Sequence, residues 1–148
     1  MNRRDLLSGS ALLATASLIK TAMAADEDPH AHHHHDAVSP AASLAAAASD
    51  CVQKGQACID HCLLLLGDGD RDIADCAKSV TQTTALCAAL QVSANANSKY
   101  LPKLAAIAKQ ACLDCAAECK KHADRHAQCR DCLESCEACA RQCEKFAA

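Results

Sequence analysis

The stretch CRDCLESCEACARQC, residues 129–143, places five cysteines at alternating spacings of three and four residues. Residues three and four apart lie on the same face of an α-helix. These cysteines therefore form one continuous stripe along a helix, at positions where a helix of an ordinary bundle carries Leu or Ile. Charged residues fall mostly off the stripe. The spacing predicts a helix whose interior face is lined by thiols.

Three earlier segments repeat this rhythm and carry the other eight cysteines. The pattern and the abundance of Ala, Leu, Gln, Glu, Lys and Arg predict four helices of similar length, each about 35 Å long. We expect them over residues 41–66, 70–92, 98–122 and 125–146. Short connections between such helices predict an all-α fold, an antiparallel four-helix bundle with cysteines lining the core.

Small and polar residues mark the breaks between the predicted helices. Two clear breaks lie at residues 67–70 and 93–98, and a weaker third lies between His122 and His126. The predicted capping residues are Gly67 as a C-cap, Asp70, Ser98 and Asp124 as N-caps, and Pro102 in the first turn of the third helix.

The composition limits what can stabilise this core. The chain has 148 residues, 13 cysteines, 1% aromatic residues and a net charge of −3. Such a sequence is typical of a disulfide scaffold or a metal-binding protein. The odd cysteine count excludes complete pairing within one chain. The scattered basic residues do not indicate a nucleic-acid partner.

The first 40 residues are expected to lie outside the bundle. Arg3 and Arg4, a weakly apolar stretch and a small-residue cleavage site predict a twin-arginine signal peptide over residues 1–24. The apolar stretch is too short to span a membrane. This signal predicts an exported protein, periplasmic or otherwise extracytoplasmic. Residues 25–40 form a His-rich arm, which either binds metal or is a solvated segment. The bundle is expected over residues 41–148.

Three interpretations of the thiol stripes compete: small hydrophobic residues, disulfides or thiolate ligands of metal ions. Thirteen cysteines in four stripes are too many to serve only as small hydrophobic residues. A disulfide between two cysteines on the same face of one helix would be strained. We therefore favour metal binding. The candidate ligands are Cys51, Cys58, Cys62, Cys76, Cys87, Cys112, Cys115, Cys119, Cys129, Cys132, Cys136, Cys139 and Cys143.

Charge favours copper as the metal. Several zinc ions, each with four thiolates, would leave many negative charges in a narrow core. Cu(I) prefers thiolates and accepts low coordination numbers, so thiolates that bridge two ions give a neutral core with on the order of one Cu(I) per Cys. The natural units are pairs four residues apart: Cys58/Cys62, Cys115/Cys119, Cys132/Cys136 and Cys139/Cys143. A metallothionein-like zinc or cadmium buffer is the alternative, and a structural bundle of reduced thiols a third hypothesis.

Histidines are expected at one end of the antiparallel bundle. The order of the helices brings His61, His122 and His126 to the same end as Cys62 and Cys119. His61 is a candidate metal ligand there, since imidazoles at an open end could pass copper inward. The four leucines of residues 63–66 either plug this end or pack in the core. No residue arrangement indicates an enzyme.

The twin-arginine signal, the four predicted helices and the inward CxxxC and CxxC strings resemble the exported copper storage proteins of methane-oxidising bacteria. The resemblance covers residues 41–148. It implies Cu(I) storage with all 13 cysteines as ligands, a homotetramer, and supply of copper to the particulate methane monooxygenase. In that family His and Met line the opening. His61 matches the histidine, whereas leucines at residues 63–66 stand in place of the methionines.

Overall fold

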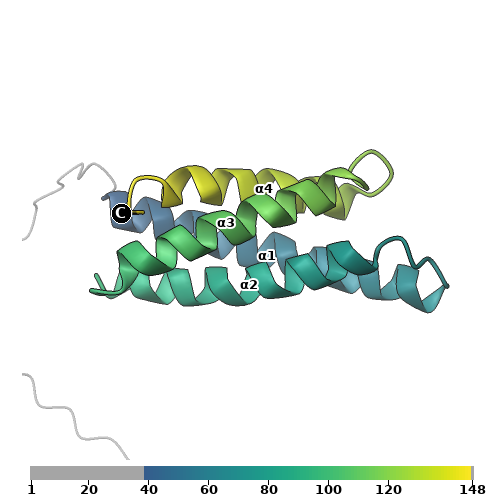
Figure 1. Ribbon diagram of the computed structural model, residues 1–148, viewed down its shortest axis with the longest axis horizontal. Helices are drawn as coiled ribbons and strands as arrows, with labels where there is room; N and C mark the ends of the chain where they lie inside the picture. The colour runs from purple at the N-terminus through teal and green to yellow at the C-terminus, as the bar shows by residue number, and fades with distance from the viewer. Residues whose placement is uncertain (1–38, 148) are drawn as a thin grey trace, which may run out of the picture. The chain divides into compact units, whose positions relative to one another are not determined.

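A computed structural model describes residues 39–147 of the chain. This part contains four helices: α1 (Pro40–Gly67), α2 (Ala74–Asn95), α3 (Leu101–Lys120) and α4 (Ala127–Cys143) (Figure 1). The prediction of an all-α four-helix bundle is confirmed. The predicted signal peptide and the His-rich arm up to residue 38 lie outside the described residues.

The helices form a ring in which each runs antiparallel to its two neighbours (Figure 1). Helix α1 packs against α2 and α4, and α3 packs against the same two helices. The last turns of α1 and α3 therefore lie beside the first turns of α2 and α4. We call this end of the bundle the histidine end, because His61, His122 and His126 lie there. The opposite end, which holds the first turns of α1 and α3, is called the closed end.

The helices differ in length more than the sequence pattern predicts. Helix α1 has 28 residues and α4 has 17, which correspond to about 42 Å and about 26 Å. The side chain of Ser39 accepts a hydrogen bond from the backbone N–H of Ala42 at 3.1 Å, and Pro40 occupies the first turn. This cap starts α1 at Pro40, one residue before the expected position.

The first two breaks overlap the predicted ones but lie a few residues later, at residues 68–73 and 96–100, and the capping residues act differently. Asp68 caps α1, and Gly69 adopts a φ of 94°, a conformation that favours glycine. Asp70 accepts a hydrogen bond from the N–H of Asp72 at 3.1 Å, and Ser98 accepts one from Tyr100 at 3.2 Å. Both side chains stabilise the turn before a helix instead of its first residue, because α2 and α3 begin at Ala74 and Leu101.

The third break is wider than predicted. Helix α3 ends at Lys120 and a turn follows to Arg125, whereas continuation to His122 was expected. The extended residue before α4 is His126, so the prediction that Asp124 caps this helix is wrong. At the other end of α4, Phe146 N–H bonds the carbonyl of Cys143 at 3.0 Å, so the chain tightens into a turn after Cys143 instead of continuing as a helix.

The interior contains few large apolar side chains. The largest fully buried ones are Leu44, Ile73, Leu90 and Val80. Leu44 and Leu90 lie toward the closed end with buried Leu101, and thiols and alanines occupy much of the remaining core. Among residues 39–147, no helix is both long enough and apolar enough to cross a membrane.

Candidate metal centre

All 13 cysteines are free and buried, each with at most 1% of its surface exposed. They come from all four helices and point into the ring, as the stripes predict. The shortest distances between two sulfurs are 3.6 Å, well beyond the length of a disulfide bond, which is about 2.05 Å. The interior of the bundle is therefore a column of thiols, which we call the sulfur column.

The sulfur column begins at the histidine end with four thiols that come from three helices. Cys58 and Cys62 of α1, Cys76 of α2 and Cys129 of α4 have sulfurs that all lie within 4.8 Å of one another. Cys58 Sγ is 4.0 Å from Cys62 Sγ and 3.9 Å from Cys129 Sγ. We call these residues the four-sulfur group. Of the groups that the described residues form, it has the most ligands.

The middle of the column joins α1, α3 and α4. Two groups of three sulfurs lie there, each within 4.8 Å: Cys58, Cys119 and Cys132, and Cys115, Cys132 and Cys136. Cys115 Sγ lies 3.9 Å from Cys119 Sγ and 4.0 Å from Cys132 Sγ. Each sulfur therefore has neighbours both along its own helix and across the ring.

The column continues toward the closed end. Cys136 Sγ is 3.6 Å from Cys51 Sγ, and Cys51 forms a group of three with Cys87 and Cys112. Cys87 Sγ lies 3.6 Å from Cys112 Sγ and 3.9 Å from Cys139 Sγ. Twelve sulfurs are thus linked without a gap by distances of at most 4.8 Å. The thirteenth, Cys143, follows Cys139 at the end of α4.

Hydrogen bonds between neighbouring thiols shift the pKa values of the cysteines in both directions along the column. In the four-sulfur group, the other three thiols, first Cys129, donate to Cys62 and lower its pKa, and the charge of His61 adds to this effect. Neighbouring thiols, first Cys112, lower the pKa of Cys51 in the same way. Hydrogen bonds with neighbours, first Cys115, and burial raise the pKa of Cys119. A second negative charge beside a buried thiolate is unfavourable, so ionisation of one thiol disfavours ionisation of its neighbours.

The three histidines predicted to share one end do lie there. His61 Nε2 and His126 Nδ1 are 3.0 Å apart, so one ring nitrogen donates to the other. Both rings are half-buried, while His122 is buried, with 6% exposed. The run of leucines divides: those at positions 65 and 66 pack against the core, and Leu63 and Leu64 are exposed.

Helical spacing anticipated which sulfurs are neighbours along one helix but not which meet across the ring. The pairs Cys58/Cys62 and Cys115/Cys119 lie at 4.0 and 3.9 Å as expected. The four-sulfur group and the contact between Cys51 and Cys136 were not anticipated. These contacts are hard to predict from the sequence, because they depend on how far each helix is shifted along the bundle axis relative to its neighbours. The turns between the helices determine this shift.

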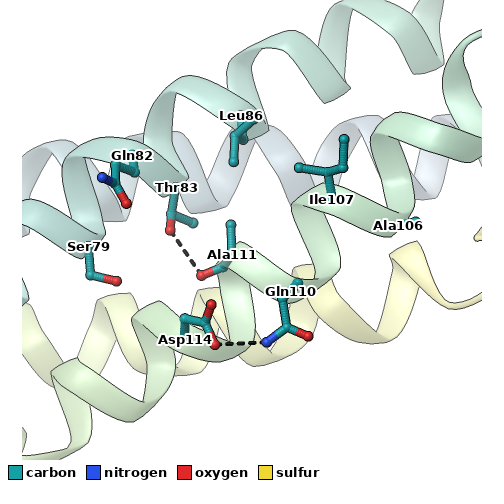
Figure 2. A pocket seen from close by; sticks show the side chains of 9 residues that line it. All are labelled: Ser79, Gln82, Thr83, Leu86, Ala106, Ile107, Gln110, Ala111 and Asp114. Carbon is teal, nitrogen blue, oxygen red and sulfur yellow. Dashed lines mark hydrogen bonds between the residues drawn. The ribbon is translucent and has the colours of Figure 1, made fainter.

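A groove of about 510 Å³ lies outside the sulfur column, between α2 and α3 (Figure 2). Its lining includes Leu86 and Ile107. Thr83 Oγ1 donates a hydrogen bond to the carbonyl of Ala111 at 3.0 Å, which ties the two helices together beneath the groove. No cysteine lines this groove, so it is separate from the metal centre.

A four-helix bundle with a continuous column of free thiols defines a class of protein suited to hold soft, thiophilic metal ions. The model of the family described as Csp, copper storage protein, matches residues 37–148. The chain belongs to the copper storage protein family, as its resemblance to that family predicted.

Two solved structures share this fold. The Cu(I)-bound copper storage protein BsCsp3 is 24% identical, with a TM-score of 0.66 over 74% of this chain and 100% of that chain. Apo-Csp3 (copper storage protein 3) from Bacillus subtilis is 25% identical, with a TM-score of 0.63 over 72% of this chain and 97% of that one. No curated protein matches the chain.

Proposed function

We propose that this protein stores Cu(I) ions along the sulfur column, with the 13 cysteines as ligands and on the order of one ion per cysteine. The observation that carries the proposal is the unbroken series of sulfur neighbours, each at most 4.8 Å from the next. Separate tetrahedral sites need four thiols each and no links between sites. A continuous column suits ions that each bind two sulfurs and thiolates that each bridge two ions.

Charge balance supports copper as the load. If every thiolate bridges two Cu(I) ions and every ion takes two sulfurs, the numbers of ions and thiolates are equal and the filled core is neutral. A neutral load avoids the large cost of burying unpaired charge. Family membership and the Cu(I)-bound state of BsCsp3 support the same metal.

Anaerobic titration of the fully reduced protein with Cu(I), against a competing Cu(I) chelator, tests the capacity. We expect saturation on the order of 13 ions per chain, one for each cysteine. Loading should also release about one proton per ion from the thiols that are still protonated. Saturation at three or four ions, with stronger binding of Zn(II) than of Cu(I), would instead support the zinc or cadmium buffer.

We further propose that copper passes through the histidine end, with His61 as a transient ligand. Imidazole nitrogens bind copper. His61 directly precedes Cys62 in the sequence, and His61 and His126 are paired at the histidine end of the column. The closed end has Leu44 and Leu90 in the corresponding place. We expect H61A to slow copper uptake while leaving the final capacity unchanged. Stopped-flow absorbance of the Cu(I)–thiolate bands measures the rate, and Tyr100→Ala, an exposed position at the closed end, is the control.

An unchanged uptake rate in H61A would exclude this role, and a loss of capacity would make His61 a storage ligand. The two outcomes separate transfer of copper from its storage. The exposed Leu63 and Leu64 do not replace the sulfur ligands that methionines would offer at this end.

The resemblance and the signal sequence support four further parts of the proposal. We propose export through the twin-arginine pathway to an extracytoplasmic compartment, a storage role without a catalytic step, supply of copper to a cuproenzyme such as methane monooxygenase, and a homotetramer. Cell fractionation with and without R3K/R4K tests export. Incubation of the loaded protein with an apo-cuproenzyme tests supply.

The outer face of α2 supports the homotetramer. No charged residue occurs in residues 79–98, and the groove beside this face exposes Ile107, with 56% of its surface accessible. In a two-fold interface the same face of both copies meets, and an uncharged face can do so without burying unpaired charge. Light scattering after size-exclusion chromatography measures the mass. We expect I107E to reduce it to that of smaller species, and an unchanged mass would exclude this face as the interface.

A further inference from the structure

The four-sulfur group has a geometry that differs from the rest of the sulfur column. A tetrahedral zinc site with Zn–S distances of about 2.3 Å has sulfurs about 3.8 Å apart. Cys58 Sγ lies 4.0 Å from Cys62 Sγ and 3.9 Å from Cys129 Sγ, within about 0.2 Å of that separation. Cys76 completes the group, and all four sulfurs lie within 4.8 Å of one another.

The other sulfur groups among residues 39–147 have three members each. A tetrahedral ion placed in one of them would lack its fourth thiolate. Copper does not distinguish the groups in this way, because Cu(I) accepts two or three sulfurs. Among residues 39–147, a divalent ion that requires four ligands therefore has one place in this column where four thiols lie within 4.8 Å of one another.

The position also reduces the cost of charge. One divalent ion with four thiolates carries a net charge of −2, which is unfavourable deep in a narrow core. The four-sulfur group lies at the histidine end of the column and not in its middle, and the half-buried ring of His61 directly precedes Cys62 on α1. A single such ion is therefore tolerated here more easily than in the middle of the column.

From this geometry we propose a second metal site: the four-sulfur group binds one divalent ion of the zinc or cadmium type per chain when copper is absent. The ion joins α1, α2 and α4 at the histidine end and occupies the ligands that incoming Cu(I) meets first. Cu(I) must displace it as the column fills. This site goes beyond the storage proposal, because it concerns the copper-free protein and a different class of metal.

Co(II) is the probe, because its visible spectrum reports both the ligand type and the geometry. Reduced, copper-free protein titrated anaerobically with Co(II) should saturate at one ion per chain, with the intense bands of a tetrahedral four-thiolate site. Addition of Zn(II) should remove these bands stoichiometrically. Binding should also raise the midpoint of thermal unfolding, since the ion binds only the folded site.

Two variants on the same helix provide a matched comparison. Cys76 and Cys87 are both fully buried on α2, but Cys87 belongs to a group of three. We expect C76S to lose the four-thiolate spectrum, weaken Zn(II) binding at least tenfold and abolish the rise in unfolding temperature. C87S should keep all three properties. C129S, on α4, should behave as C76S does, and circular dichroism shows whether each variant folds.

Equal effects of C76S and C87S would overturn the proposal, as would saturation above one Co(II) per chain or a spectrum without tetrahedral thiolate bands. The copper capacity of the same variants separates this site from storage. Each substitution removes one thiol, so C76S and C87S should lose equal amounts of Cu(I) capacity. A C76S variant that loses the Co(II) site but no more Cu(I) capacity than C87S therefore separates the divalent site from copper storage.

Discussion

The thiol group is small and weakly polar, so a single cysteine can occupy a core position without an obligatory hydrogen-bond partner. In this bundle 13 of them stand where larger side chains are normally found, and all are buried. Each thiol buries less apolar surface than Leu or Ile, so the copper-free core contributes less to stability per residue. The stability of the bundle therefore depends more on the few positions where a residue without a large side chain lets two helices pack closely together.

Gly55 is such a position, where α1 lies against α2. A methyl group added at this residue would lie 2.5 Å from Thr84 Oγ1, which donates a hydrogen bond to the carbonyl of Val80 at 2.8 Å. Alanine favours helix by about 1 kcal/mol over glycine, but the clash should exceed this gain. We expect G55A to lower the free energy of unfolding by about 1–3 kcal/mol, measured by chemical denaturation of the copper-free protein.

Two further variants test whether the clash is the cause. Nothing lies within 4 Å of a methyl group added at Gly67, so G67A should cost little. Thr84→Ala removes the atom that clashes and should recover most of the stability lost in G55A. Equal stability of G55A and the unsubstituted protein would show that the side chain of Thr84 moves away, or that the two helices shift, at no cost.

At the scale of the helices, spacing along the chain predicted the inward faces well and the helix ends less well. The cysteines expected to face inward on α2, Cys76 and Cys87, are both fully buried. The end of α3 and the start of α4 were misplaced because residues 121–126 carry no strong helix stop signal, and the position of His126 in the fold sets the start of α4. Local sequence signals are weak wherever tertiary packing decides between helix and turn.

The large apolar side chains of the closed end should dominate the stability of the copper-free bundle. Leu90 is fully buried on α2, in a core with few other large side chains. We expect L90A to lower the free energy of unfolding by about 2–5 kcal/mol. The copper capacity should not change, because no sulfur is removed. Chemical denaturation and Cu(I) titration of the same sample measure both quantities.

Leu64, with 70% of its surface exposed, provides the control for this prediction. L64A should leave both stability and capacity close to those of the unsubstituted protein. A large loss of copper capacity in L90A with its helical content retained would mean that the apolar side chains of the closed end also position sulfur ligands.

At the scale of the whole molecule, the folded state changes the ionisation of most of its thiols. Hydrogen bonds with neighbouring thiols, together with burial, raise the pKa of eight cysteines, whereas hydrogen bonds from neighbouring thiols lower the pKa of four others. In an unfolded chain a thiol ionises near pH 8.5. Above this pH the unfolded chain loses protons that the folded protein retains at the eight positions, so the free energy of unfolding must fall.

We therefore expect the copper-free, reduced protein to become less stable as the pH rises from about 8.5 to 10. The four cysteines with a lowered pKa do not offset this loss, because their contribution is already complete above pH 8.5. Urea denaturation at fixed pH values measures the trend. The copper-loaded protein should lack it, since its thiols are already deprotonated. A constant stability of the copper-free protein over this pH range would show that the buried thiols do not retain their protons.

The sequence by itself determined the helical fold, the inward direction of the cysteine stripes and the resemblance to the copper storage family. These follow from spacing along one helix, which is a local property of the chain. Only the tertiary structure decided that Cys58, Cys62, Cys76 and Cys129 form one group, that His61 meets His126, and that the sulfur column is continuous. Such contacts depend on the relative heights of antiparallel helices, and a shift of a single turn, about 5.4 Å, exceeds every sulfur–sulfur distance on which the metal centre depends.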